Sequence, residues 1–230
     1  MSRLPLLLLW DIDGTLLRRA SEAHAAALIR AVGDVRGVDV RGVPVDAAGR
    51  TDRAIARSLL EAVGIGAEAV DGRAEDVLAA TCALYEDLCP PDLSAMVAPG
   101  IPALLDALAA RTEEFRFSLV TCNFEQVARL KLARAGIGHH FAAGQGAFGS
   151  DAEAREALPA IARARAGGWP RERTVVIGDT PRDIACARAD DVAVVGIATG
   201  PYASAELGAA DAVVEEAAAL EPVLAAMARG

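Results

Sequence analysis

Four short apolar runs, separated by helical segments, constrain the fold of this chain more than any other feature. They cover residues 6–10, 115–120, 174–177 and 192–197. Continuous apolar runs of this length are typical of strands that are buried on both faces, as in parallel sheets. Helices are expected between and after them, at about 101–110, 124–135, 152–166 and 182–190. This alternation predicts an α/β fold, with a parallel sheet covered by helices.

Residues 18–95 interrupt the alternation. They contain no convincing pair of strands and are rich in alanine, which favours helices. We expect three or four helices there, at about 21–32, 52–63 and 67–88. The sequence therefore predicts a core domain of residues 1–17 and 96–230 and an inserted helical cap domain of residues 18–95.

Charge and cysteine content limit the partners of the chain. A formal net charge of −9 argues against nucleic acid or an anionic membrane surface as a partner. No apolar stretch is long enough to span a bilayer, and the apolar run near the N-terminus is too short for a secretion signal. The four cysteines form no CxxC pair, which favours a reduced, cytoplasmic protein. The sequence gives no indication of an oligomeric state.

Polar side chains follow three of the predicted strands. Asp11 and Asp13 come directly after the first, Thr121 and Asn123 end the second, and Asp179 follows the third. The carboxyl ends of parallel strands lie at one edge of a sheet, where ligands bind. Hard oxygen ligands gathered in one place suit Mg²⁺, which also compensates the cost of burying several carboxylates. We therefore expect a magnesium site at this edge.

These motifs together resemble those of the haloacid dehalogenase superfamily. The matching stretches are Asp11-Ile-Asp13-Gly14-Thr15, Val120-Thr121-Cys122-Asn123 and Gly178-Asp179-Thr180-Pro181-Arg182-Asp183. The resemblance covers essentially the whole chain, including a helical cap after the first motif. It implies a Rossmann-like core and an aspartate-based phosphotransferase, most similar to phosphoglycolate phosphatases.

The resemblance also implies a role for each matching residue. Asp11 is expected to attack the phosphoryl group, and Asp13 to protonate the leaving oxygen and later activate water. Asp179 is expected to complete a Mg²⁺ site with Asp11 and the backbone carbonyl of Asp13. The residues of the second motif that are expected to hold the phosphate are Thr121, Cys122 and Asn123. Asp183 of the third motif is expected to support the metal ligands without binding the metal itself.

The sequence departs from the family pattern at one cation. Family members usually carry a lysine between the second and third motifs, where it neutralises the phosphate and pairs with the nucleophile. The corresponding stretch here contains Arg155 instead, and Lys131 is the only lysine in the chain. We expect Arg155 to replace the family lysine, because it carries the same charge and binds phosphate bidentately. Lys131 is the alternative, on a helix where we expect it to be a surface residue.

Further residues narrow the reaction. Residues 18–95 contain no lysine for a Schiff base, which argues against phosphonate cleavage, and Asp13 favours phosphoryl transfer over carbon–halogen cleavage. Arg50, in a loop of the cap, is expected to contact a carboxylate or second phosphate of the substrate. The three histidines have no ligand spacing and are expected to be surface or cap residues; they are His24, His139 and His140.

Three alternatives stay open. Residues 144–149 match G-x-G-x-x-G, a dinucleotide-binding pattern that requires a strand directly before it and a helix opening within it. A non-catalytic module of the same superfamily and a phosphomutase are the others. The function predicted from the sequence is a Mg²⁺-dependent phosphatase that acts on a small phosphate ester, such as phosphoglycolate or a sugar phosphate.

Overall fold

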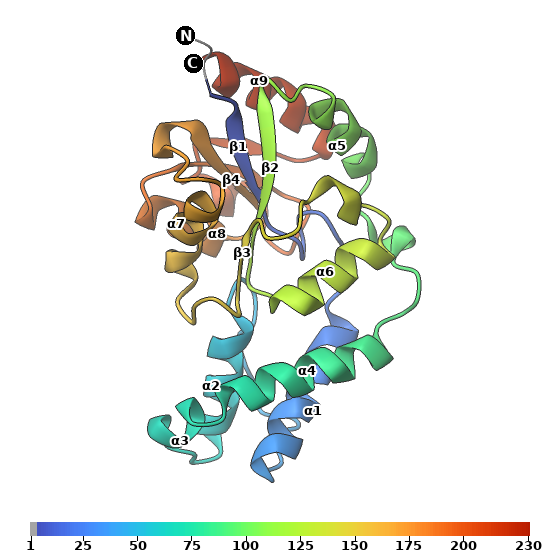
Figure 1. The fold of residues 1–230 in the computed structure, drawn as a ribbon, viewed down its shortest axis with the longest axis vertical. Helices are drawn as coiled ribbons and strands as arrows, with labels where there is room; N and C mark the ends of the chain where they lie inside the picture. The colour runs from blue at the N-terminus through green and yellow to red at the C-terminus, as the bar shows by residue number, and fades with distance from the viewer. Residues whose placement is uncertain (1–3) are drawn as a thin grey trace.

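A six-stranded parallel sheet forms the centre of the protein (Figure 1). The computed structural model describes residues 4–230. The strands are β1 (Leu6–Trp10), β2 (Phe115–Thr121), β3 (Ala147–Phe148), β4 (Thr174–Gly178), β5 (Ala193–Ile197) and β6 (Ala212–Val214). Their order in the sheet is β3-β2-β1-β4-β5-β6. β1 therefore lies between β2 and β4, the two other strands whose ends carry the predicted polar residues.

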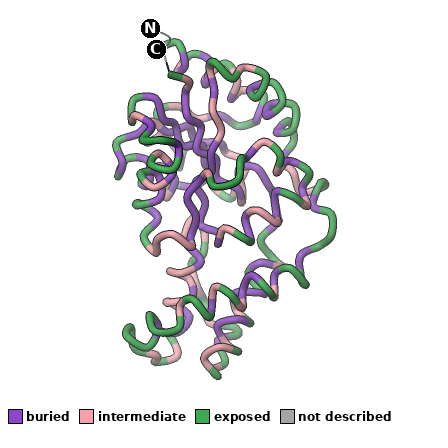
Figure 2. The backbone as a smooth tube through the Cα atoms, in the orientation of Figure 1, coloured by how far each residue is buried: buried purple, intermediate pink, exposed green. Residues whose placement is uncertain are grey.

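Both faces of the sheet are covered, as the apolar runs predict. Leu6, Leu8 and Trp10 of β1 pack with the helices of one face, and Leu7 and Leu9 with those of the other. The first face carries α5 (Ile101–Ala109), α6 (Glu125–Arg134) and α9 (Leu220–Arg229), and the second carries α7 (Leu158–Arg165) and α8 (Pro181–Ala189). Figure 2 shows the strands buried and the outer turns of the helices exposed. The predicted α/β fold is confirmed.

The inserted segment forms four helices beyond the carboxyl ends of the strands (Figure 1). They are α1 (Glu22–Arg36), α2 (Asp52–Ala62), α3 (Ala67–Asp71) and α4 (Ala74–Leu88). α1 packs along α4, and α4 also contacts α6 of the core. The segments that enter and leave this region lie side by side, because Arg18 N donates to Met96 O at 2.7 Å and Ala98 N donates to Leu16 O at 2.9 Å. This pairing fits the predicted domain boundaries, which remain a proposal. The first three residues of the predicted core domain lie outside the described residues.

Several predicted elements need adjustment. The strands β3 and β6 and the helix α9 were not expected, and the helix expected over 152–166 begins only at Leu158, after a short 3₁₀ turn at Arg155–Ala157. The G-x-G-x-x-G pattern contains β3 instead of following a strand, and no helix opens within it, so it lacks the arrangement that binds a dinucleotide. All four cysteines are buried and free. Within residues 4–230, no helix is both long enough and apolar enough to cross a bilayer.

Candidate active site

The carboxyl ends of β1, β2 and β4 open into a cavity of about 670 Å³ between the core and the cap. Asp11, Asp13, Cys122, Asn123 and Asp179 line it from the core. Arg50 and Arg155 line it as well, whereas Thr121 and Asp183 do not. The sheet topology thus brings together nearly all of the residues singled out from the sequence, because β1 pairs with β2 on one side and with β4 on the other.

Three buried carboxylates lie together on the core side of this cavity, and two of them, Asp11 and Asp179, line it. Oxygen atoms of Asp11, Asp179 and Asp183 come within 4.8 Å of one another. Thr15 Oγ1 donates to Asp179 Oδ1 at 3.0 Å, but Asp179 Oδ2 is buried with no hydrogen-bond partner. Gly14 (φ +92°) allows this approach, because a Cβ atom there would overlap the Asp179 carboxylate.

The grouping of charge raises the pKa values of two of these acids. Burial, and then the charge of Asp183, raises the pKa of Asp11 well above its ordinary value. The same two causes raise the pKa of Asp179 to about 7. A bound dication favours ionised carboxylates, and the unpartnered Asp179 oxygen offers it a ligand. The residues present therefore fit Mg²⁺, with Asp11 and Asp179 as side-chain ligands.

Asp183 has a different environment from the other two acids. Its carboxylate accepts hydrogen bonds from Thr180 N at 2.9 Å and Thr180 Oγ1 at 2.7 Å, which caps helix α8. Its other oxygen accepts from Arg155 Nη2. Both oxygens of Asp183 are thus engaged by protein donors, whereas Asp179 Oδ2 has none.

Arg155 is the one cation whose side chain contacts this acidic group among the described residues. It is 5% exposed, and its Nη2 lies 3.6 Å from Asp11 Oδ1. Its Nη1 donates to Cys122 Sγ at 3.0 Å. Arg155 is therefore enclosed in the site and is not a solvated residue. Burial is the main cause that raises the pKa of the Cys122 thiol, so this cysteine packs as a neutral group.

Lys131 lies in the same site, on the other side of Asp13. The expectation that it is a surface residue is wrong, since its side chain is 0% exposed. Its Nζ donates to both oxygens of Asp13, at 2.8 and 2.6 Å, and to Asn123 Oδ1 at 2.7 Å. The helix α6 faces the cap at this point, so a position that its polar sequence indicated as exposed is enclosed.

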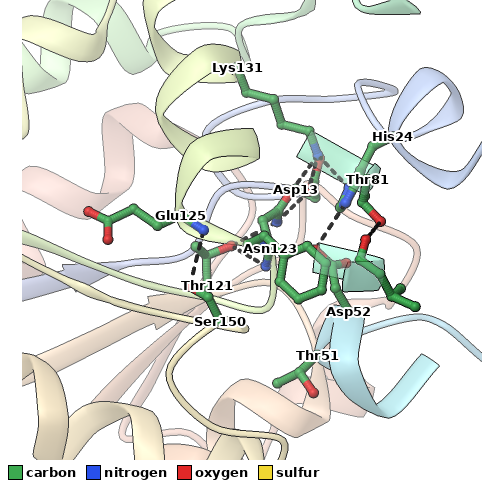
Figure 3. A network of polar contacts seen from close by, with 12 residues as sticks. Asp13, His24, Thr51, Asp52, Thr81, Thr121, Asn123, Glu125, Lys131 and Ser150 are labelled. Atoms are coloured by element: carbon green, nitrogen blue, oxygen red, sulfur yellow. Dashed lines mark hydrogen bonds and ion pairs between the residues drawn. The ribbon is translucent and has the colours of Figure 1, made fainter. Parts of the chain in front are cut away.

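Asp13 belongs to a polar network that joins core and cap, drawn in Figure 3. Asn123 Nδ2 donates to Asp13 Oδ2 at 2.8 Å and to Thr121 Oγ1 at 2.9 Å, so the side chain of Asn123 is occupied by protein partners. Burial alone would raise the pKa of Asp13, but the charge of Lys131 and the hydrogen bonds from Lys131 and Asn123 lower it. Asp13 is thus held as a carboxylate.

Two cap residues that the sequence did not single out for the site complete this network. His24 Nε2 lies 3.0 Å from Asp52 Oδ2, and Lys131 Nζ lies 3.3 Å from His24 Nδ1. Because a carboxylate only accepts, Nε2 carries the proton and Nδ1 accepts from Lys131. Asp52 Oδ2 also accepts from Phe124 N at 2.7 Å, and Asp52 N donates to Cys122 O at 3.0 Å. The start of α2 is therefore bonded directly to the loop of the second motif.

The remaining histidines and Arg50 differ in position. His139 and His140 do not line the cavity. Their ring nitrogens and a carboxylate oxygen of Asp106 lie within 4.8 Å of one another, a grouping that the spacing of the histidines in the sequence did not indicate. Arg50 lines the cavity, but one of its Nη atoms donates to Ala54 O at 3.1 Å and to Ser58 Oγ at 2.7 Å. Its guanidinium is thus partly occupied within α2.

Comparison with known protein families agrees with this geometry. The model of the haloacid dehalogenase-like hydrolases matches residues 8–188. The chain belongs to this family. The predicted resemblance is confirmed, and so is the prediction of an enzyme, since the family is one of hydrolases. No curated protein matches the chain.

Solved structures extend the likeness of this hydrolase to nearly its full length. A predicted phosphatase from Clostridium acetobutylicum has a TM-score of 0.69 at 18% identity, over 97% of this chain and 100% of its own. A predicted phosphoglycolate phosphatase from Haemophilus somnus has a TM-score of 0.64 at 18% identity, over 97% and 99%. CbbY from Rhodobacter sphaeroides, in complex with phosphate, has a TM-score of 0.67 at 16% identity, over 95% and 97%. These likenesses establish a shared fold.

Proposed function

We propose that the protein is a Mg²⁺-dependent phosphatase that hydrolyses a small phosphomonoester through an aspartyl-phosphate on Asp11. The observation that carries this proposal is the buried group of Asp11, Asp179 and Asp183 beside Arg155. Asp11, Asp179 and Arg155 line a cavity that the cap covers. Mg²⁺ bound by Asp11, Asp179 and the backbone carbonyl of Asp13 would supply positive charge against the repulsion between a carboxylate and a phosphate. Cys122 and the second-motif loop contribute the wall on which the phosphate rests.

The side chains have separate tasks in this reaction. Asp11 attacks phosphorus, the ester P–O bond breaks, and the leaving oxygen takes a proton from Asp13. Water then attacks the phosphorus of the aspartyl-phosphate and gives a proton to Asp13. The bond between phosphorus and Asp11 breaks, so that inorganic phosphate is released and the Asp11 carboxylate is restored. The contact with Lys131 favours the carboxylate form of Asp13, which the second step requires. Proton donation in the first step requires Asp13 to take up a proton against that contact.

We propose that Arg155, and not Lys131, takes the place of the family lysine. Arg155 lies beside Asp11, whereas Lys131 contacts Asp13. Arg155→Lys is expected to retain most turnover, and Arg155→Met to lose at least about 100-fold in kcat, because one donor to a transferring anion is worth about that much. If Arg155→Met turns over normally while Lys131→Met does not, the assignment is wrong.

The proposal is tested by the release of inorganic phosphate from a panel of phosphomonoesters. We expect turnover with Mg²⁺, none with EDTA, and a loss of at least about 1000-fold in Asp11→Asn, because the nucleophile is removed. Asp34→Asn, an exposed position on α1, is the matched control and is expected to keep full activity. Hydrolysis that survives both EDTA and Asp11→Asn contradicts the proposal. A phosphomutase would instead return the phosphoryl group to the substrate, without stoichiometric release of phosphate.

A further inference from the structure

The two walls of the cavity differ in chemistry. The core wall carries the carboxylates and Arg155, but the cap wall is largely aliphatic. Its larger apolar side chains come from α1, from the loop between α1 and α2, and from α2; they are Leu28, Ile29, Val43, Val45, Ile55 and Leu59. A phosphate held at the core wall would therefore direct its organic part toward a hydrocarbon surface.

The polar groups deepest on the cap side of the cavity are already engaged. One Nη of Arg50 donates to Ala54 O and Ser58 Oγ of α2, and His24 and Asp52 are bonded to each other. The other polar cap residues that line the cavity, Arg18, Arg19 and Ser21, are exposed to solvent. Hydroxyl groups of a bound sugar that lie on the aliphatic side chains would lose hydrogen bonds to water without gaining protein partners there, which is unfavourable.

The loop of the cap wall is held against the core. Arg182 of the third motif donates to Ala48 O, and its Nη2 donates to Asp46 Oδ2 at 2.7 Å. Gly49 (φ +67°) lies so close to the core that a Cβ atom there would come within 2.9 Å of Thr180 Oγ1. Val45 directly precedes this anchored stretch, and Val43 lies two residues before Val45. The aliphatic wall is thus in place before a substrate binds, as in most small-molecule sites.

We propose that the preferred substrate of this site is a phosphate monoester whose alcohol or phenol portion is apolar. The proposal rests on the phosphatase function proposed above, and it replaces the phosphoglycolate- or sugar-phosphate-like substrate expected from the sequence. A cavity of about 670 Å³ is within the size range of small-molecule sites and exceeds what a phosphate alone requires. Methylene groups placed on the aliphatic wall leave water, which strengthens binding.

The test compares two esters of equal carbon number, hexyl phosphate and glucitol 6-phosphate, with Mg²⁺ and the full-length protein. Acetyl phosphate, which is too small to reach far along the cap wall, reports the reaction itself. We expect kcat/KM for hexyl phosphate to exceed that for glucitol 6-phosphate by at least about tenfold, since each buried methylene contributes roughly a factor of three to four. If acetyl phosphate is hydrolysed but kcat/KM is equal for the two six-carbon esters, the apolar preference is wrong and the phosphatase function stands. If not even acetyl phosphate is hydrolysed, the phosphatase function fails and this proposal fails with it.

Paired variants locate the preference. Val43→Thr with Val45→Thr keeps the shape of the wall and adds two hydroxyls, and it is expected to lower the hexyl-to-glucitol ratio about fivefold. The matched control is Val35→Thr with Val38→Thr, two half-buried cap valines outside the cavity. The control is expected to leave the ratio unchanged, and acetyl phosphate turnover checks that both proteins are folded. A ratio that is the same in both variants and the parent protein would overturn the proposal.

Discussion

Asp11 and Asp13 are separated by one residue but lie in opposite electrostatic surroundings. Asp11 shares its side of the site with Asp179 and Asp183, and Arg155 is the one cation that contacts this group among the described residues. Asp13 is bonded to Lys131 and Asn123 and has no second carboxylate in direct contact. As a result, the pKa of Asp11 is raised, mainly by burial, and that of Asp13 is lowered by Lys131 against the effect of its burial.

The protein itself supplies the positive charge that balances Asp13, whereas the acidic group around Asp11 requires an added cation. The side of Asp13 is balanced by protein groups, so removal of Lys131 leaves the half-buried Asp13 carboxylate without its counter-charge. The side of Asp11 carries more negative than positive charge, so it gains stability from an added cation. Variants on the two sides should therefore respond in opposite ways to Mg²⁺ and to pH.

Loss of Lys131 is expected to give the largest change in stability. Lys131→Met retains an unbranched apolar stem but removes the cation from Asp13 and the donor from Asn123. We expect the free energy of unfolding to fall by about 3 kcal/mol, because breaking a buried ion pair leaves an uncompensated charge. Urea denaturation at pH 7 measures this change.

The double variant Lys131→Met/Asp13→Asn is the control for that interpretation. With both charges removed, the unpaired carboxylate is absent, and most of the lost stability should return. A loss of less than about 1 kcal/mol in Lys131→Met, or no recovery in the double variant, would contradict the assignment of Lys131 as the partner of Asp13.

Mg²⁺ is expected to stabilise the protein through the side of Asp11. At about 100 times its dissociation constant, a bound ion adds about 2.7 kcal/mol to the free energy of unfolding. Asp179→Asn should abolish most of this gain, because it replaces the carboxylate whose Oδ2 has no protein partner. Urea denaturation with and without Mg²⁺ tests both statements. Asp34→Asn should keep the full gain, and an equal gain in Asp179→Asn would place the ion elsewhere.

Without metal, stability should fall as pH rises. Burial, followed by Asp183, raises the pKa of Asp179 to about 7, whereas an unfolded aspartate ionises near about 4. Between these values the native state binds the proton more tightly than the unfolded state does, so raising the pH costs stability. We expect a decrease of about 2 kcal/mol from pH 4 to pH 7 in EDTA, since the charge is shared with Asp11 and Asp183.

Asp179→Asn serves as the comparison for this pH dependence. It removes the titrating group, so the slope of unfolding free energy against pH in EDTA should decrease markedly. Thermal or urea unfolding at several pH values measures the slope. A slope that stays the same in Asp179→Asn would assign the dependence to other groups.

The sequence predicts the fold and the Asp11 side of the site better than the Asp13 side. Strands β1, β4 and β5 lie in short apolar runs, and β2 is mainly apolar with Arg116 and Ser118 within it. This pattern leaves little alternative to a parallel sheet, and each predicted acid follows β1 or β4. β3 has two residues and β6 has three, so their pairing depends on neighbours and not on a local pattern. Arg155 was predicted as a site residue because it lies between the second and third motifs, where family members usually carry a lysine.

His24 and Asp52 were not predicted as site residues, and Lys131 was named only as the alternative to Arg155, because tertiary contacts alone bring these three residues together. Lys131 lies on a helix with many polar residues, a pattern that is typical of solvent exposure, yet the cap encloses it. His24 and Asp52 are 28 residues apart on different helices, so no spacing rule connects them. The sequence did contain one indication of the role of Lys131, since it is the only lysine in a chain whose other basic side chains are almost all arginine.

The smallest expected effect belongs to the link between His24 and the rest of this network. His24→Phe keeps the ring that packs edge-on against Tyr85, at 5.6 Å between centroids, and removes both nitrogens. Asp52 retains its bond from Phe124 N, and Lys131 retains Asp13 and Asn123, so neither group is left without a partner. We therefore expect a loss of only about 1 kcal/mol in urea denaturation.

Turnover of hexyl phosphate, whose alcohol leaves only with a proton, by the same variant tests whether the cap influences Asp13. His24 contacts Lys131, and Lys131 holds the carboxylate that is proposed to move the proton, so kcat should fall by a few fold while KM changes little. His139→Phe, at an exposed position outside the cavity, is the matched control and should alter neither quantity. If His24→Phe loses stability but keeps the parent kcat, His24 joins cap to core without positioning Asp13. The balanced side of the site would then depend on Lys131 and Asn123 alone.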